Sequence, residues 1–492
     1  MKKQIISSIL LSVLVTLGAM AESLTIEPGT LAQSIQNPSE VTELELAGRA
    51  NAADFKFMAT EMPELVSLDL SGLLAIDAVN DVFFANITRH PAGKIPTNTF
   101  AGSKLSSVTL PSFKNLNIGD GAFAGTKLSA VNIPATTTLL GAGAFAGCDE
   151  LVSVVCGAAN IGHGAFADCP KLATVSFTAP VEIPVACFMN DAALKTVSGT
   201  VQSVGNRAFI GCSSLESFPF TASLHMIGRE AFLGAGLTEI NLTETAVDSI
   251  GEWAFAKMPA LKSVKIAPST GMGRAVAFAC PQLAAFAFAS DAEELPDFAL
   301  AKTGVSDTIG LIPEQVRRIG QYAFSGLSGI KSLTLPTTLE YIGDHAMENM
   351  TGLEHITAEI NNVPELGEDV WAGVDQGSVE LRVPNEMFDA FNNADQWQNF
   401  SIVKTSSSID AVVTEELSQL RARFDGDDLI VDIADVEIDR LMLFNPAGQL
   451  LIAVEPSDST VVIDTFGFGT RLFIVNAALS DGRVASLKIA KR

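Results

Sequence analysis

The sequence contains few of the residues and motifs on which enzyme active sites are built. Its 492 residues include five histidines, three tryptophans and two tyrosines. It has no HExxH, paired CxxC, P-loop, GxGxxG or GxSxG motif, so a zinc, nucleotide or serine-nucleophile site lacks support. Carboxylates are plentiful, but none stands in a distinctive pair. We therefore expect a non-enzymatic protein without catalytic residues, metal or cofactor.

Positive charge is also scarce. The chain has 31 Lys and Arg against 56 Asp and Glu, for a formal charge of −25. A uniformly acidic surface argues against binding to nucleic acid and to anionic membranes. The charges form no long block of one sign, which is typical of an evenly charged, soluble surface. After residue 21, no apolar run approaches the roughly 18 residues of a transmembrane helix.

The first 21 residues, MKKQIISSILLSVLVTLGAMA, differ from the rest of the chain. Two lysines precede an apolar run, and Ala19, Met20 and Ala21 form a small-residue cleavage motif. This order predicts a signal peptide at 1–21 that is cleaved between Ala21 and Glu22. No cysteine stands at the cleavage point, which argues against a lipid anchor. Export from the cell follows from this interpretation.

A nine-residue phrase returns along the chain. It reads IGHGAFADC at 161–169, LGAGAFAGC at 140–148 and VGNRAFIGC at 204–212, and its anchor residue recurs every 21–24 residues. Such a period predicts a solenoid in which each turn is one structural unit that packs on its neighbours. The repeat anchors are Phe100, Phe123, Phe145, Phe166, Phe188, Phe209, Phe232, Phe255, Phe278, Leu300, Phe324 and Met347.

Each repeat has two halves. The first half, L-x-x-V-x-I, alternates apolar positions and predicts one short β-strand per turn of about 22 residues. The second half, I-G-x-x-A-F, predicts an opposite wall whose Ile, Ala and Phe point inward, with Gly allowing a tight turn. Stacked turns bury a continuous column of these side chains, each contributing about 1.5–3 kcal/mol when fully buried. The expected fold class is a repeat solenoid followed by a small C-terminal all-β sandwich.

The repeat resembles the BspA-like leucine-rich repeat of bacterial surface proteins, whose pattern is IGxxAFxxCxxLxxVxIP. The resemblance covers roughly residues 41–403. The segment at 41–72 is similar to the opening turns of such proteins, and the segment at 371–403 is similar to their closing segment. We expect N-terminal capping turns at 22–99 and leucine-rich repeats with their C-terminal cap at 100–403.

Six cysteines in an exported protein raise the question of disulfides. Cys148, Cys169, Cys212 and Cys280 all lie three residues before the strand Leu, in a slot that other repeats fill with Met or Leu. Free cysteine behaves as a small hydrophobic residue in such a slot, so packing is the favoured interpretation. Cys148 and Cys169 occupy consecutive turns, where the strand spacing approaches disulfide reach. Whether these two are bridged stays open.

The outward positions of the strands offer an extended surface. They are mostly small and polar, and the structural interpretation is that stacked Ser and Thr form cross-strand ladders. The functional interpretation is a long, flat protein-docking surface that binds by area and not through a deep pocket. The lack of aromatic platforms on this strip counts against carbohydrate as the main ligand. The candidate binding residues are Glu239, Asn241, Lys265, Thr334 and His355.

The repeat pattern stops near residue 404. The polar stretch at 404–422 is interpreted as a linker. Short alternating segments between 423 and 492, such as DLIVDIA and STVVIDT, predict a β-sandwich with hairpin turns at 445–448 and 480–482. A plain terminal β-domain and a domain with a role in secretion are both compatible with this pattern.

This unit resembles the type A C-terminal sorting domain of the type IX secretion system. The resemblance is carried by LMLFNPAGQLL, by FIVNAALSDGRVASLKIAKR and by the terminal Lys491 and Arg492. The family usually has Gly two residues before an aromatic residue, whereas Gly469 here precedes Phe473 by four. The resemblance implies passage across the outer membrane, removal of this domain, and release or attachment to surface polysaccharide.

The favoured function is a scaffold for adhesion or recognition, secreted or held at the outer surface of a bacterium. The BspA-like resemblance implies host matrix proteins, other cells or cell-surface glycoconjugates as ligands, and the C-terminal resemblance implies secretion machinery as a partner. The alternative is a secreted nutrient- or glycan-binding protein, which a deep pocket or an aromatic cluster on one face would favour. A hydrolase is the third class considered, but the chain leaves no spare domain for its site.

Overall fold

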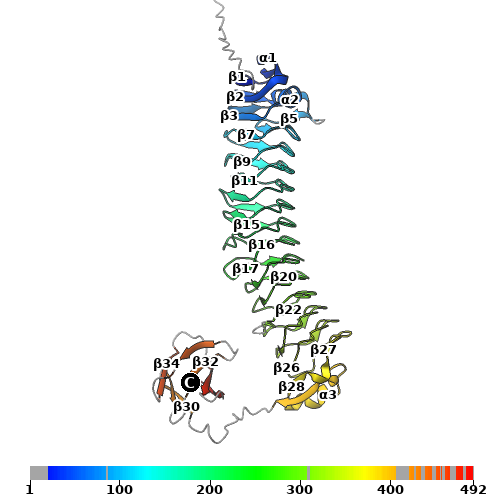
Figure 1. Cartoon of the computed structure of the whole chain (residues 1–492), viewed down its shortest axis with the longest axis vertical. Helices are drawn as coiled ribbons and strands as arrows, with labels where there is room; N and C mark the ends of the chain where they lie inside the picture. The colour runs from blue at the N-terminus through cyan, green and yellow to red at the C-terminus, as the bar shows by residue number, and fades with distance from the viewer. Residues whose placement is uncertain are drawn as a thin grey trace, which may run out of the picture. The chain divides into compact units, whose positions relative to one another are not determined.

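The chain divides after Val403 into two compact units. The computed structural model describes residues 20–84, 87–306, 311–358, 360–405, 420–425, 428–433, 438–445, 450–454, 456, 460–465, 472–479 and 484–490. Most of the predicted signal peptide, linker residues 406–419, turn residues 446–449 and 480–482, Gly469, Lys491 and Arg492 lie outside this part of the chain. The first unit is a stack of similar turns (Figure 1).

The L-x-x-V-x-I half of each repeat forms a first wall of parallel strands. In β9 and β24 every second residue is buried, so one side of the strand faces the core. Neighbouring strands are in register, as Val154 pairs with both Val131 and Val175. The sheets run in the orders β1-β2-β3-β7, β14-β12-β11-β9, β17-β19-β21 and β24-β26-β28-β29. Their strands are β1 (Met20–Ile26), β2 (Val41–Asn51), β3 (Ser67–Asp77), β7 (Ser107–Thr109), β9 (Ala130–Ile133), β11 (Ser153–Cys156), β12 (Thr174–Phe177), β14 (Thr196–Ser198), β17 (Glu239–Asn241), β19 (Ser263–Lys265), β21 (Ala285–Ala287), β24 (Ser332–Leu335), β26 (His355–Ala358), β28 (Glu380–Pro384) and β29 (Ser401–Thr405).

The I-G half of each repeat forms a second wall of parallel strands, which adds a second short strand to many turns. In β16, β18, β22 and β23 an exposed residue precedes a buried Ile or Leu. The sheets run in the orders β10-β8-β6, β13-β15-β16-β18-β20 and β22-β23-β25-β27. Their strands are β6 (Lys94–Ile95), β8 (Leu116–Ile118), β10 (Thr137–Leu140), β13 (Val181–Ile183), β15 (Val201–Val204), β16 (Met226–Ile227), β18 (Ser249–Ile250), β20 (Gly271–Met272), β22 (Glu294–Leu295), β23 (Arg318–Ile319), β25 (Tyr341–Ile342) and β27 (Glu365–Leu366).

The glycine that follows the second-wall Ile is required by the close approach of neighbouring turns. A Cβ on Gly162 would lie 2.4 Å from the backbone N of Ala142, and a Cβ on Gly251 would lie 2.3 Å from the backbone N of Arg229. Both glycines have a negative φ, which residues with a side chain also adopt. The glycine is therefore kept because any side chain would collide with the preceding turn, and not for the freedom to make a tight turn.

The phenylalanines of the repeat form a buried column between the two walls. From Phe100 to Phe255, rings in successive turns have centroids 5.2–6.1 Å apart. Each of these side chains is at most 2% exposed. Aromatic rings at this separation gain contact energy beyond the area that they bury. Phe324 also lies fully buried in the same core, further along the stack.

The column is interrupted where Ala277 takes the place of a phenylalanine. The backbone N–H of Ala277 donates to Ala299 O, just as the N–H of Phe255 donates to Val276 O in the preceding turn. Phe278, which the sequence suggested as the anchor, lies one residue further on and is only half-buried. That assignment was out of register because intervals of 22 and 23 residues from Phe255 both fit the repeat.

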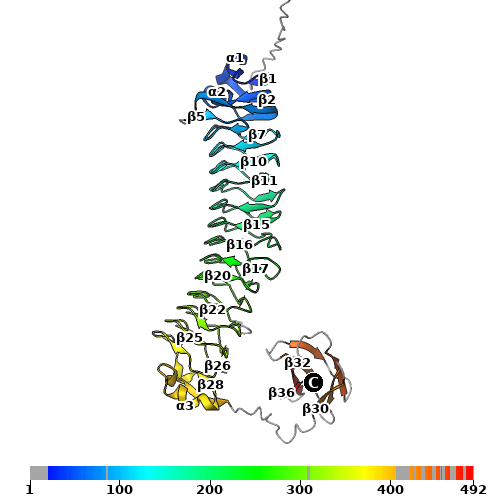
Figure 2. The same ribbon diagram turned by 180° about the vertical axis from the view of Figure 1, so that it is seen from behind.

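The two ends of the stack carry the helical segments (Figures 1 and 2). At the N-terminal end, Asn51 caps α2, and the buried Asp54 carboxylate accepts backbone hydrogen bonds from Gly29, Leu31 and Asn51. The elements there are α1 (Leu31–Ser34), η1 (Pro38–Glu40), α2 (Ala52–Glu61) and the antiparallel pair β4 (Val79–Phe84) and β5 (Ile87–His90). At the C-terminal end, Trp371, Phe391, Trp397 and Phe400 form an aromatic cluster. The elements there are η2 (Gln376–Ser378), η3 (Asn385–Met387), α3 (Phe388–Asn392) and η4 (Trp397–Asn399).

The second unit is a small all-β fold with its own core. One antiparallel sheet has the order β30-β31-β34 and the other has the order β33-β32-β35-β36. Leu429, Val461, Leu441 and Phe473 belong to one buried cluster that draws on both sheets. The strands are β30 (Leu420–Asp425), β31 (Asp428–Ile433), β32 (Ile438–Phe444), β33 (Leu450–Val454), β34 (Thr460–Asp464), β35 (Leu472–Leu479) and β36 (Val484–Ala490).

Candidate binding groove on the second wall

The candidate residues of the first wall fall into two groups. Glu239 and Asn241 lie on β17 and Lys265 on β19, where Asn241 pairs with Lys265. Thr334 and His355 lie on β24 and β26 of another sheet. All are exposed except His355, which is half-buried. The structure therefore brings the first three together and places the other two further along the stack.

The first wall presents a regular outward strip. Ser153 pairs with Thr174, and Val155 pairs with Ser176. Asn241 is engaged locally, because its Oδ1 accepts hydrogen bonds from the backbone N and the hydroxyl of Thr243 at 3.1 and 2.8 Å. Small side chains in register make this strip even along its length. It offers area for docking and few groups that converge on one point.

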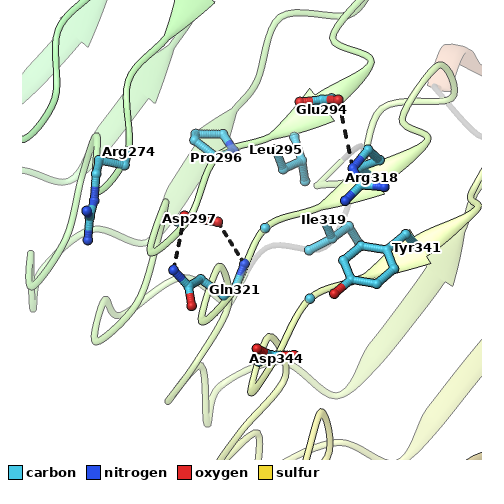
Figure 3. A pocket seen from close by; sticks show the side chains of 12 residues that line it. Arg274, Glu294, Leu295, Pro296, Asp297, Arg318, Ile319, Gln321, Tyr341 and Asp344 are labelled. Atoms are coloured by element: carbon cyan, nitrogen blue, oxygen red, sulfur yellow. Dashed lines mark hydrogen bonds and ion pairs between the residues drawn. The ribbon is translucent and has the colours of Figure 1, made fainter. Parts of the chain in front are cut away.

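A groove of about 480 Å³ lies instead on the second wall (Figure 3). Four successive turns line it. The outward residues of β22, β23 and β25 form one row, and the residues that follow the Gly or Pro of each turn form another. The polar lining residues are Glu294, Arg318 and Tyr341 in the first row and Arg274, Asp297, Gln321 and Asp344 in the second row.

The first row is held by a stacked cation and ring. The Arg318 guanidinium lies 4.4 Å from the centroid of the Tyr341 ring, a cation–π contact. The Nε of the same arginine is 3.9 Å from Glu294 Oε1. This ion pair is exposed and longer than a hydrogen bond, so it adds little stability. Its effect is to orient Arg318 between an acidic side chain and an aromatic one.

The carboxylates of the second row join neighbouring turns. Asp297 Oδ1 accepts from the backbone N of Gln321 at 2.9 Å, and its Oδ2 accepts from Gln321 Nε2 at 3.2 Å (Figure 3). Asp344 Oδ1 accepts from the backbone N of Glu368 at 2.8 Å. The same link occurs elsewhere in the stack, where Asp120 accepts from the backbone N of Ala142. Both oxygens of Asp297 and one oxygen of Asp344 therefore have a structural role.

Several polar atoms of the groove have no hydrogen-bond partner among the described residues. These are the guanidinium of Arg274, the hydroxyl of Tyr341, Oδ2 of Asp344 and Oε1 of Gln321. The Arg274 guanidinium does lie over the Phe298 ring, 5.5 Å from its centroid. The groove thus offers both donors and acceptors to a ligand.

An aromatic ladder runs along the turns beside the groove. We call it the turn-edge ladder, and it comprises Trp253, Phe278, Phe298, Tyr322 and His345, all half-buried. Phe298 stacks on Tyr322 at 4.9 Å between centroids, and Tyr322 stacks on His345 at 4.8 Å. Trp253, Phe298, Tyr322 and His345 have φ between 53° and 59°, a left-handed conformation that bulky residues rarely adopt. Phe298, Tyr322 and His345 each follow a groove residue directly in the chain.

A second groove, of about 410 Å³, lies further toward the N-terminus on the same wall. Val185 and Met226 line it and are 36% and 39% exposed. His163, Glu182 and Gln202 supply its polar groups. Because this groove has no Phe, Tyr, Trp or Arg side chain, it offers fewer directional contacts than the first.

The six cysteines are all buried and free. The thiols of Cys148, Cys169, Cys212 and Cys280 lie 3.1–3.2 Å from the carbonyl oxygen of the anchor residue one turn earlier, so these thiols donate to the backbone. Burial raises the pKa of Cys156 and of Cys280 to about 11. A thiol with such a pKa is a poor nucleophile and a poor metal ligand near neutral pH.

Ala21 and Glu22, which flank the predicted cleavage point, lie on β1, paired with Glu43 and Leu44 of β2. Across the residues that the structure describes, no group of His, Cys, Asp and Glu is arranged to hold a metal ion. Within that same part of the chain, no helix has the length and apolar character to cross a membrane.

The repeat pattern also matches a known family. A sequence profile for the BspA type leucine rich repeat region matches residues 86–195, 181–306 and 308–420, which together make up more than half of the chain. The chain belongs to the BspA-type leucine-rich repeat family. No curated protein is significantly similar to it.

Solved structures of leucine-rich repeat proteins resemble this BspA-type chain at low identity. One, from Bacteroides ovatus ATCC 8483, is 19% identical, with 78% of this chain and 87% of that chain covered and a TM-score of 0.49. A leucine rich cell surface protein from Faecalibacterium prausnitzii A2-165 is 22% identical, with coverages of 58% and 86% and a TM-score of 0.29. The family assignment rests on the repeat profile alone.

The groove residues of this BspA-type stack were not predicted from the sequence. The outward position before the second-wall Ile has no fixed residue type, so the repeat pattern does not mark it. One signal was present, because the only two tyrosines of the chain, Tyr322 and Tyr341, lie 19 residues apart and so in neighbouring turns. Rare aromatic residues that cluster within a repeat are a reason to inspect that face.

Proposed function

We propose that the protein is an exported, non-enzymatic recognition scaffold that binds macromolecules outside a bacterial cell. One observation carries this proposal: successive turns present side chains on both walls in register, at the strand spacing of about 4.8 Å. A surface built in this way is long, even and only shallowly grooved, which suits binding to extended partners. The basic and apolar order of residues 1–21 supports export.

The second wall is the favoured recognition face. It holds both grooves, the Arg318–Tyr341 pair and the polar groups that lack partners. The strip of Glu239, Asn241, Lys265, Thr334 and His355 on the first wall is proposed as an additional docking area that contributes contact without specificity. Binding energy usually concentrates on a few residues in a converging site, and this argues for the groove over the strip.

The C-terminal unit is proposed to direct secretion through the type IX system. In support, β35 (Leu472–Leu479) and β36 (Val484–Ala490) pair antiparallel, within one of the segments that carry the resemblance to the sorting domain. The unit has its own core, as a detachable domain requires. The domain boundaries proposed for the whole chain are 1–21, 22–99, 100–403, 404–422 and 423–492.

The function is tested with the full mature chain. We expect saturable binding to at least one member of a panel of extracellular-matrix proteins, epithelial cells and bacterial cells, measured by biolayer interferometry and by flow cytometry. An unrelated acidic protein of similar size serves as the control, because it reports binding by charge alone. Absence of saturable binding across the whole panel would contradict the proposal. Mass spectrometry of the secreted protein checks cleavage before Glu22.

A glycan-binding protein is the second candidate function. The specific observation in its favour is the concentration of rings, guanidinium groups and unpartnered polar atoms around one groove of the second wall. The sequence argued against carbohydrate only for the first-wall strip, which lacks aromatic platforms. That argument does not apply to this groove.

A further inference from the structure

We infer that the groove from Arg274 to Asp344 binds a neutral oligosaccharide. This inference rests on the proposed function, since it names the class of ligand that the recognition scaffold would take through its second wall. Four features of the groove support it: the regular spacing of the lining groups, their hydrogen-bonding capacity, the lack of an apolar anchor point and the sign of the charge.

The first feature is the regular spacing of polar groups. Four successive turns each place a polar side chain in the second row, and three of them also place one in the first row. The turns follow one another at the strand spacing of about 4.8 Å. A pyranose ring in an extended oligosaccharide has a similar repeat, so consecutive sugars meet equivalent positions in consecutive turns. A ligand with a single polar group would use only one of these positions.

The second feature is the mixture of donors and acceptors. Arg274 supplies donors, the Tyr341 hydroxyl is both donor and acceptor, and Asp344 Oδ2 is an acceptor, and all are unpartnered among the described residues. Sugar hydroxyls donate and accept in the same way. Such a set of groups is complementary to a polyhydroxylated ligand, which satisfies both kinds of partner.

The third feature concerns peptides. Of the apolar lining residues, Leu295 and Ile319 are buried in the core, and only the small ring of Pro296 is half-exposed. The groove therefore gives a protein ligand no open apolar hole in which an anchoring side chain could be desolvated, and such anchors dominate protein–protein binding energy. Hydrogen bonding along the groove, which a glycan uses, does not depend on such a hole.

The fourth feature is charge. Arg274 and Arg318 bring two positive charges to the lining, while Glu294, Asp297 and Asp344 bring three negative charges. The chain as a whole carries a formal charge of −25. An anionic glycan would meet repulsion both near the groove and at long range. The ligand is therefore expected to be uncharged.

Contacts between neighbouring turns hold the groove side chains in place. The Arg318 guanidinium covers one side of the Tyr341 ring, and the turn-edge ladder packs the turns that carry Asp297, Gln321 and Asp344. The left-handed backbone of the ladder residues also occurs at the same turn position in repeats outside the groove, as at Ala186, so it belongs to the repeat and not to the groove. Side chains that are already oriented lose less conformational entropy on binding.

The inference is tested by isothermal titration calorimetry on the full chain with cellohexaose, maltohexaose, xylohexaose and mannohexaose as neutral probes. Heparin hexasaccharide and oligogalacturonate are the anionic probes. We expect saturable binding of at least one neutral probe and none of the anionic ones. Binding of only anionic probes, or of none of the six, overturns the inference.

Variants locate the site. Tyr341→Phe should weaken binding of the neutral probe by about two- to tenfold, the range for one lost hydrogen bond, and Arg274→Gln should weaken it by at least as much. The matched controls are Lys114→Ala and Lys171→Ala, two exposed lysines outside both grooves and outside the first-wall strip, which should leave binding unchanged. Circular dichroism melts check that each variant is folded.

The outcomes separate this inference from the proposed function. If the full chain binds matrix proteins or cells but no neutral oligosaccharide, the inference fails and the scaffold function stands. If neutral probes bind but Lys114→Ala or Lys171→Ala weakens binding as much as Tyr341→Phe, the ligand class holds and the groove is wrong. If nothing in either panel binds, both fail.

Discussion

Asp191 is the one acidic side chain that occupies the slot used by Cys148, Cys169 and Cys212 in neighbouring turns. It is fully buried, and its Oδ1 accepts from the backbone N of Cys169 at 2.7 Å. Its Oδ2 has no hydrogen-bond partner within the described part of the chain. Burial, with a smaller contribution from the charge of Asp168, raises the pKa of Asp191 to about 8.

Because folding raises the pKa of Asp191, the contribution of this group to stability falls as the pH rises. An unfolded aspartate titrates near 3.9, so folding takes up a proton at Asp191. The contribution of this group to stability is therefore fully present below about pH 4 and is lost as the pH rises toward 8. The groups that face it are Asp168 and the thiols of Cys169, Cys187 and Cys212. None of these thiols carries a charge that could offset the ionised carboxylate.

Replacing this residue by the one found in the neighbouring turns should stabilise the repeat unit. We expect Asp191→Cys to raise the free energy of unfolding at pH 8 by about 1–3 kcal/mol, the cost of a buried polar group without a partner. The gain should shrink as the pH falls toward 4. Guanidinium unfolding at pH 4.5, 6 and 8 measures it, with the exposed Asp149→Asn as control. If the gain in the free energy of unfolding did not change with pH, removal of a buried ionisable carboxylate would not be the cause of the gain.

At the scale of the element, the turn of each repeat contains a position with left-handed backbone. Gly121, Gly143 and Gly164 occupy it in three consecutive turns, with φ of 58° in each. In the next turn Ala186 occupies it with a φ of 55°. Glycine adopts this conformation without cost, whereas a residue with a Cβ is strained there by about 1–2 kcal/mol.

A substitution to glycine should therefore be stabilising in this turn, against its usual effect. We expect Ala186→Gly to raise the free energy of unfolding by about 0.5–1 kcal/mol, because relief of the strain exceeds the added entropy of the unfolded chain. Thermal melts of the purified full chain provide the measurement. The control is Ala208→Gly, a buried alanine outside the left-handed position, which should be destabilising. Equal losses in the two variants would refute the strain argument.

At the scale of the whole molecule, the repeat unit depends on each turn being covered by the turns on either side. The column of rings from Phe100 to Phe255 is continuous, and the core that it joins extends from Ile26 to Phe400 without division. The C-terminal unit has a separate core. Loss of one ring inside the column opens a cavity to which the turns above and below both contribute.

Phe209 and Phe278 give a matched pair of substitutions within this core. Phe209→Ala should lower the free energy of unfolding of the repeat unit by about 3–5 kcal/mol, as for other fully buried phenylalanines. Phe278→Ala should cost clearly less, because Phe278 is half-buried and Ala277 holds the slot. Denaturant unfolding followed by circular dichroism distinguishes the two. Similar losses of unfolding free energy in the two variants would show that Phe278 belongs to the buried column.

The sequence was sufficient for the features that packing repeats in every turn. The period, the alternation of the first-wall strands and the buried residues up to Phe255 are constrained in each turn by the same neighbours. The sequence did not determine the register at Ala277, because Phe278 satisfies the repeat spacing equally well. The start of β30 at Leu420 was hidden in a stretch interpreted as linker. The groove could not be predicted, because Arg318 and Tyr341 lie at outward positions that packing leaves free.

Since successive turns repeat the same backbone hydrogen bonds at the anchor residue, as from Phe123 N to Ala144 O and from Phe145 N to Ala165 O, repeats can be exchanged. Recombination that inserts or deletes one repeat between Phe123 and Phe232 would let the new neighbours form these bonds. The stack would change in length by one strand spacing, about 4.8 Å. The order of side chains from Arg274 to Asp344 would be inherited intact. The length of the stack can therefore evolve by copy number while the groove residues are conserved.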